Sequence, residues 1–375
     1  MVATASLTLL ALLGSVALTL SGLGTPLAVA HLAFAVGIVP LIFAAMIHFV
    51  PVLTRTGDPQ AAIGRVPRLA QLAGLAAVLA MQGSLPHAVL YVAAAVDLLL
   101  AGFLLNWIAG RSRLALGSPH PGWRWYGAAL GCLMLALAAI LLQSAWPAYW
   151  LPLRRFHLHL NLLGLVGLAA LGTLPVLLPT ALGRPDPEAA GWLRRRLWPT
   201  AGGALLVAAG CAIAWPYAVP GALLLFVVAL GLGGQWLRRF GPRALFADGV
   251  AASLSAAIIG LLLNLSAGVL HGAGISDDAR TTLLAWAAGF LLPLVSGALA
   301  QLLPVWWRPG PQTPARPAMR RCLAATGTWR GALFVAAAVA LLTGQPAVAA
   351  ACVGTGIALF AIGLLQAVRI LRSTR

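Results

Sequence analysis

Apolar stretches long enough to cross a membrane recur along the whole chain of 375 residues. A helix needs about 20 mostly apolar residues to span the hydrocarbon core of a bilayer. Charged residues make up only 8% of the sequence, whereas a soluble protein carries about 25%. The sequence therefore predicts an all-α, polytopic membrane protein whose main surroundings are the lipid bilayer. Twelve transmembrane helices are expected, at residues 5–23, 26–53, 66–83, 86–109, 123–145, 156–181, 194–214, 217–237, 245–270, 280–306, 322–343 and 347–370.

The arginines indicate how these helices are oriented. The chain has no lysine, and all but three of its 24 arginines lie in or beside the connections that follow even-numbered helices. Basic residues collect on the cytoplasmic side of membrane proteins, so both termini are expected in the cytoplasm and the membrane is expected to be a bacterial-type inner membrane. The first helix has no basic segment before it and is expected to remain as an anchor. This distribution also explains the net charge of +17 without a nucleic-acid partner.

Internal similarity divides the twelve helices into three groups of four. His31, Pro51, Asp58 and Pro59 match His159, Pro179, Asp186 and Pro187 at a single offset of 128 residues. The tenth helix ends similarly at Pro304. We expect one membrane domain over residues 1–375, with pseudo-repeats at about 1–122, 123–243 and 244–375. Repeats in membrane proteins often place binding sites where they meet.

Histidines are concentrated towards the side that carries few arginines. His31, His87, His157, His159 and His271 all lie near the expected outer ends of helices. Imidazole is costly to hold near hydrocarbon unless it binds a metal or a hydrogen-bond partner. Residues two apart on a helix differ by about 200° in direction, so His157 and His159 cannot both bind one ion. Because His159 matches His31 in the repeat, these two are expected to approach a common cofactor, with His157 as a further ligand.

Three other groups of residues are candidates for function. Arg154 and Arg155 depart from the charge distribution and precede His157 closely, where guanidinium groups could bind the acidic groups of a cofactor. Asp97 is an acidic residue deep within a predicted helix, which suggests a role in proton transfer or cation binding. His87 and His271 could complete a second metal site.

The sixth helix resembles a known ligand helix. The sequence Phe156-His157-Leu158-His159-Leu160-Asn161-Leu162-Leu163-Gly164, together with the helix count, resembles subunit I of the haem–copper oxidases and nitric oxide reductases. The chain also resembles the haem- and copper-containing NnrS-type membrane proteins of the nitric-oxide response. The resemblance implies a haem held by His31, His157 and His159, copper as a further candidate, and Arg154 and Arg155 near the propionates. In the oxidases the His-x-His pair lies on the tenth helix, which has no histidine here, so a degenerate relative is expected.

Three functional classes remain open at this point. The first is a haem-binding redox or gas-handling protein for nitric oxide or oxygen, which would receive electrons from a donor protein or partner subunit. If it is an enzyme, it is expected to be a haem-dependent oxidoreductase. The second is a transporter for a metal or small solute, because Pro40, Pro175 and Pro293 interrupt the second helix of each repeat. The third is a non-catalytic membrane scaffold.

Overall fold

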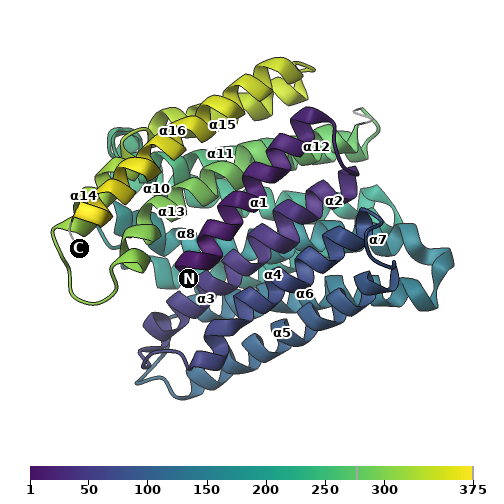
Figure 1. Ribbon diagram of the computed structural model, residues 1–375, viewed down its shortest axis with the longest axis horizontal. Helices are drawn as coiled ribbons and strands as arrows, with labels where there is room; N and C mark the ends of the chain where they lie inside the picture. Colours follow the sequence, from purple (N-terminus) through teal and green to yellow (C-terminus); the bar gives the residue numbers. More distant parts are fainter. Residues whose placement is uncertain (276–277, 374–375) are drawn as a thin grey trace. The chain divides into compact units, whose positions relative to one another are not determined.

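A computed structural model describes residues 1–275 and 278–373. Those residues form helices joined by loops, and no strand occurs among them (Figure 1). Twelve helical stretches in the described part are long and apolar enough to cross a membrane. This confirms the predicted helical membrane class and the number of helices. The stretches are Val2–Ser21, Pro26–Thr54, Ala61–Met81, Ala88–Arg113, Gly122–Ala145, Pro147–Ala181, Ala189–Ile213, Trp215–Ala247, Gly249–Gly272, Ala279–Trp307, Ala315–Leu342 and Pro346–Ser373.

Residue contacts divide the chain into two compact units. Unit 1 comprises Met1–Gly172 and Ala190–Ala218, and unit 2 comprises Thr173–Ala189 and Val219–Arg375. The single membrane domain expected from the sequence remains a prediction.

Unit 1 is built from the first seven candidate spans. Within it, α4, α5 and α6 pack side by side (Figure 1). Its elements are α1 (Val2–Ser21), α2 (Pro26–His31), η1 (Leu32–Ile38), α3 (Val39–Thr54), α4 (Ala61–Met81), α5 (Ala88–Arg113), α6 (Gly122–Ala145), η2 (Pro147–Tyr149), α7 (Trp150–His159), η3 (Leu160–Gly167), the start of α8 (Leu168–Ala181), α9 (Ala189–Ile213) and η4 (Trp215–Ala218).

Unit 2 is arranged around α11, which packs against α10, α13 and α15. Glycines allow the backbones to approach closely: a side-chain carbon at Gly260 would collide with the carbonyl of Gly289, and one at Gly249 with that of Ala324. Small residues are a common basis of helix packing in membranes. The elements are the remainder of α8, α10 (Val219–Ala247), α11 (Gly249–Gly272), α12 (Ala279–Trp286), η5 (Ala287–Leu291), α13 (Leu292–Trp307), α14 (Ala315–Ala324), α15 (Gly327–Leu342) and α16 (Pro346–Ser373).

Side chains near the ends of helices explain where several elements begin. Thr25 caps α2, because its hydroxyl accepts a hydrogen bond from the Ala28 amide and Pro26 occupies the first turn. Asp248 caps α11 by accepting from the amides of Val250 and Ala251, each at 3.0 Å. These caps satisfy amides that have no partner within the helix.

The predicted start of the sixth span at residue 156 was wrong. A 3-10 turn begins at Pro147 and α7 begins at Trp150, so His157 and His159 lie about two turns inside helical structure rather than at its first turn. Arg154 and Arg155 lie within α7, and both side chains are exposed at the helix surface, where their charge does not interrupt the helix.

π-helical segments interrupt three of the spans at related positions. The segment η1 directly follows His31, and η3 directly follows His159, which is the same offset of 128 residues. The third segment, η5, lies in the tenth span. π-helical turns are rare and are frequently found at functional sites. Their placement adds support to the repeat hypothesis.

An arginine makes a comparable contact within each of the three predicted repeats. Arg111 donates to the carbonyl of Asp58 at 2.8 Å, and Arg239 pairs with the side chain of Asp186 at 2.8 Å. In the third repeat, Arg308 donates to the carbonyl of Leu371 at 3.1 Å. In each case the loop after the second span is bound to the end of the fourth. This shared contact is a second observation in favour of the repeats.

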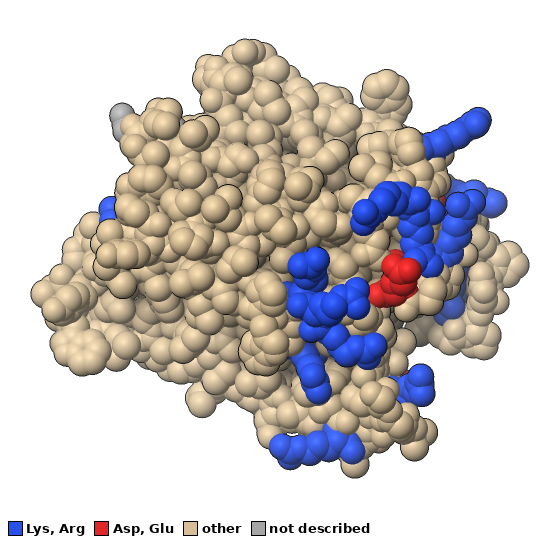
Figure 2. Space-filling view, turned by 180° about the vertical axis from the view of Figure 1, so that it is seen from behind, with Lys and Arg blue, Asp and Glu red and all other residues tan. Residues whose placement is uncertain are grey.

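The surface is consistent with a lipid environment. Many leucines are largely exposed, among them Leu10 and Leu99, which are 64% and 74% exposed. Figure 2 shows broad areas with neither basic nor acidic side chains, while the basic side chains in view are gathered in groups. Exposed apolar area on this scale is typical of a surface covered by lipid.

Candidate functional site: a histidine pair in unit 1

Two predicted ligands come together in unit 1. His31 ends α2, His157 lies in α7, and both are half-buried. Their ring centres are 6.4 Å apart and the ring planes differ by only 8°. Residues 126 positions apart in the sequence therefore place two parallel imidazoles next to each other.

Hydrogen bonds to backbone carbonyls fix the protonation of these rings. Nδ1 of His31 lies 2.8 Å from the carbonyl oxygen of Leu27, and Nδ1 of His157 lies 3.0 Å from that of Ala136. A carbonyl oxygen can only accept, so Nδ1 is the donor and Nε2 of each neutral ring keeps its lone pair. Metal-binding histidines in proteins usually have this arrangement, in which the second nitrogen orients the ring.

His159 repeats the local geometry of His31. Its Nδ1 donates to the carbonyl of Arg155 at 2.8 Å, four residues earlier. His31 makes the equivalent bond to Leu27, and in both cases a π-helical segment begins at the next residue. The sequence match between these two histidines therefore extends to their hydrogen bonds.

Asn161 is a further side chain at the pair. Its Nδ2 donates to the carbonyl of His157 at 2.8 Å and lies 3.4 Å from Nε2 of the same ring. The amide can therefore hold the ring in place, and it can also donate weakly to the nitrogen that a metal would use. The sequence contains Asn161 one turn after His157 but gave no indication of this contact.

Arg154 is a charged residue that influences the histidine pair. Its positive charge acts on both His31 and His157, and its guanidinium lies 5.8 Å from the ring centre of Trp150. Arg154 and Arg155 are both exposed. Arg154 is thus close enough to attract an acidic group of a molecule bound beside the histidines.

The other predicted metal ligands lie elsewhere. His87 precedes α5 and packs edge-on against Tyr91, while His271 lies near the end of α11 in unit 2. The described residues contain no group of three or more His, Cys, Asp or Glu side chains arranged to hold a metal ion. The proposed second site of His87 and His271 remains a prediction.

Asp97 is a buried carboxyl group in the first half of α5. It is 7% exposed, and its Oδ1 accepts no hydrogen bond within the described part of the chain. A buried polar atom without a partner costs free energy, and a charged one costs far more. Its retention in a transmembrane helix is the kind of feature expected at a proton or cation site.

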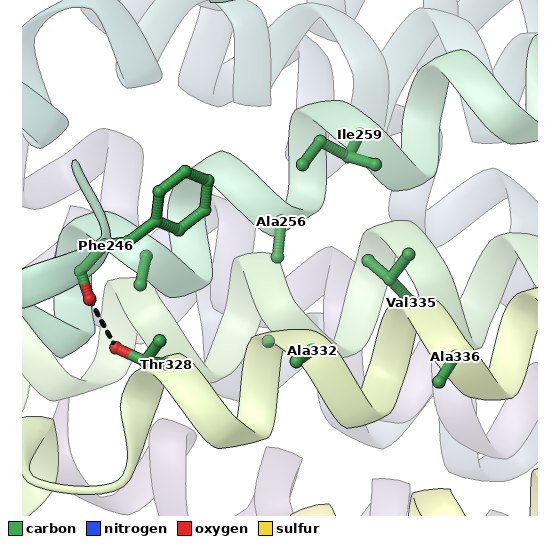
Figure 3. Close-up of a pocket in the computed structure, with 9 residues that line it drawn as sticks. Phe246, Ala256, Ile259, Thr328, Ala332, Val335 and Ala336 are labelled. Carbon is green, nitrogen blue, oxygen red and sulfur yellow. Dashed lines mark hydrogen bonds between the residues drawn. The ribbon is translucent and has the colours of Figure 1, made fainter. Parts of the chain in front are cut away.

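A cavity lies in unit 2, where the end of α10, α11 and α15 supply its lining residues (Figure 3). Its volume is about 390 Å³, and the Thr328 hydroxyl on its wall donates to the carbonyl of Phe246 at 2.9 Å. The remaining lining is apolar and contains no acid, base or metal ligand. It is formed by Phe246, Ala252, Ala256, Ile259, Thr328, Gly331, Ala332, Val335 and Ala336.

No protein-family model matches the chain, and no curated protein matches it either. The fold defines the class of the molecule as a polytopic helical membrane protein. The resemblance to the haem–copper oxidases and to NnrS-type proteins remains a hypothesis that rests on the sequence alone.

Proposed function

We propose that this protein is a haem-binding membrane protein with a redox or gas-handling role, in which His31 and His157 bind the haem iron. The single observation that carries the proposal is their pair of parallel rings, 6.4 Å apart. An imidazole binds a metal through a nitrogen lone pair, and Nε2 of each of these rings keeps its lone pair. Two neutral imidazoles with free Nε2 atoms are a donor set that would hold a haem iron.

The surrounding groups suit the same cofactor. The carbonyls of Leu27 and Ala136 hold the Nδ1 protons and leave Nε2 of each ring to a metal. Arg154 supplies positive charge beside both rings, and a guanidinium can bind a propionate through two parallel hydrogen bonds. Arg155 is assigned the same role on the basis of its position in the sequence.

Haem would supply a one-electron redox centre, and two histidines that both hold its iron would favour electron transfer over direct gas binding. His159, one turn from Arg155 and matched to His31, is the candidate for a second ligand position. Electrons would come from a donor protein or partner subunit, and copper remains a further candidate cofactor.

A second candidate function, transport of a metal or small solute, is favoured by Asp97. A buried carboxyl group whose Oδ1 has no partner within the described residues is more typical of a transport path than of a haem pocket. The interrupted spans, each with a π-helical segment, could supply backbone groups to a solute.

The test is the absorption spectrum of the protein purified in detergent, with iron and copper analysis of the same sample. We expect a Soret band that shifts and sharpens on reduction with dithionite. His31→Ala and His157→Ala should each remove or shift the band, whereas His87→Ala should not. A colourless protein without iron, purified from cells supplied with haem precursors, would contradict the proposal and favour transport.

A further inference from the structure

A small pocket in unit 1 lies where α6 begins, apart from the histidine pair. Its volume is about 80 Å³, which is enough for a small anion. Two arginines are among the residues that line it, Arg124 on α6 and Arg194 on α9. The complete lining is Ser118, Pro119, Pro121, Trp123, Arg124 and Arg194.

Arg124 and Arg194 are each the sequence neighbour of a residue in one buried contact between α6 and α9. The indole nitrogen of Trp125 donates to the carbonyl of Leu193 at 3.0 Å, and the Trp125 ring stacks on Trp192 with centres 5.7 Å apart. Trp125 is completely buried. Since Arg124 and Arg194 adjoin this contact in the sequence, their backbones are fixed relative to each other.

The loop that closes the pocket is also held in one conformation. The amide of His120 donates to the carbonyl of Leu53 at 2.8 Å, and Nδ1 of His120 accepts from the Gly122 amide at 3.3 Å. Pro119 and Pro121 restrict the backbone on either side of His120. The pocket therefore exists before any ligand binds, which lowers the entropic cost of binding.

The pocket has an excess of positive charge. Within residues 1–275 and 278–373, the ion pairs to carboxylates involve Arg239 and Arg320, and neither Arg124 nor Arg194 takes part in one. Arg124 instead lies over the ring of Trp123 at 5.6 Å. Because Arg124 and Arg194 line one pocket with no acid among its lining residues, their like charges repel each other, and a bound anion would relieve that repulsion.

We propose that this pocket binds a phosphate group, as an anionic phospholipid headgroup or as free phosphate. Guanidinium groups match the oxygens of phosphate with paired hydrogen bonds, and the hydroxyl of Ser118 adds a further donor. The lipid source is favoured by Trp123, because tryptophan is enriched at membrane interfaces. It is also favoured by the position of the pocket in an arginine-rich connection between spans. The proposal does not depend on the haem assignment.

The experiment compares lipid binding by two double variants of the full chain. Delipidated protein in a neutral detergent is titrated with phosphatidylglycerol and the bound lipid is counted by native mass spectrometry. Arg124→Gln with Arg194→Gln should weaken binding about tenfold or more, since both paired interactions are lost. Arg195→Gln with Arg196→Gln removes the same charge from α9 outside the pocket and should change affinity less than about twofold.

Two further experiments decide whether the bound phosphate belongs to a lipid and whether guanidinium groups are needed to bind it. Inorganic phosphate is titrated by equilibrium dialysis, and phosphate binding with the same variant dependence, without lipid binding, would assign the pocket to free phosphate. Arg124→Lys with Arg194→Lys keeps the charge and should restore binding only in part. The proposal would be overturned if both glutamine variants lost affinity equally. It would also be overturned if neither variant lost affinity for phosphatidylglycerol or for phosphate. Thermal unfolding of each variant confirms that it is folded.

Discussion

Acidic side chains are rare in this chain, and the carboxylate of Asp186 has three partners. Its carboxylate accepts from the Glu188 amide at 2.8 Å and from Gln235 at 3.1 Å, and it pairs with Arg239. The side chain is only 2% exposed. Asp186→Ala leaves these donors without an acceptor, so we expect a loss of about 1–3 kcal/mol in unfolding free energy, discounted because Arg239 is partly exposed.

The matched control for Asp186 is Glu188, two residues further on. Its carboxylate is 70% exposed and lies 3.7 Å from the same arginine. Glu188→Gln should therefore change unfolding free energy by less than about 0.5 kcal/mol. Thermal unfolding in detergent compares the two variants, and equal losses would show that the bonds of Asp186 do not stabilise the fold.

His120 makes stability depend on pH. Burial, and secondarily the charge of Arg194, lower the pKa of this imidazole below its usual value of 6.5. Its Nδ1 also accepts from the Gly122 amide, a bond that protonation of this nitrogen would break. The unfolded chain thus takes up the proton more readily, so stability that is complete above pH 6.5 is lost as the pH falls towards the lower folded pKa.

We expect His120→Asn to reduce this dependence. The fall in unfolding temperature between about pH 7.5 and about pH 5 should be smaller in the variant than in the parent protein. Differential scanning fluorimetry based on tryptophan emission measures both. The same fall in both proteins would mean that other groups cause the acid sensitivity.

Close glycine contacts give a prediction for individual helices. Gly260 on α11 faces the backbone of Gly289, whereas Gly268 on the same helix has open space around its Cα. Gly260→Ala forces the helices apart and should cost about 1–3 kcal/mol or more. Gly268→Ala should be neutral or stabilise by about 0.5–1 kcal/mol. Unfolding temperatures that fall equally for both would rule out close packing at Gly260 as the cause.

The sequence predicted the helices well because hydrophobic length is a local property. All twelve spans were predicted, and the largest errors are at the start of the sixth, expected at residue 156 and found at Pro147, and at the end of the eighth, expected at residue 237 and found at Ala247. The π-helical segments were not predicted. Their hydrogen bonds depend on how η1 and η3 pack against neighbouring helices, and no residue pattern in Leu32–Ile38 or Leu160–Gly167 distinguishes them from α-helix.

The candidate site was predicted only in part. Residue types and the repeat singled out His31, His157 and His159, and favoured His31 with His159. Helical geometry indicated that His157 and His159 point in different directions, but only the packing of the helices places the ring of His157 against that of His31. The carbonyl of Ala136 and the side chain of Asn161 are contacts of the folded chain, so no spacing in the sequence could identify them.

Orientation in the membrane is a property of the whole molecule. The arginine distribution predicts that the connection at residues 114–121 is cytoplasmic and the one at residues 82–87 is external. Fusions that end within 114–121 should give fluorescent green fluorescent protein, and fusions within 82–87 should give active alkaline phosphatase. The opposite pattern would reverse the orientation and place the histidine pair near the cytoplasm.

We expect His31 and His157 to bind one haem iron between them. Titration of detergent-purified, haem-free protein with haemin, followed at the Soret band, tests it most directly. We expect saturation at about one haem per chain, with reduced affinity in each single alanine variant and no specific binding in His31→Ala with His157→Ala. The same titration curve in the double variant as in the parent protein would contradict it.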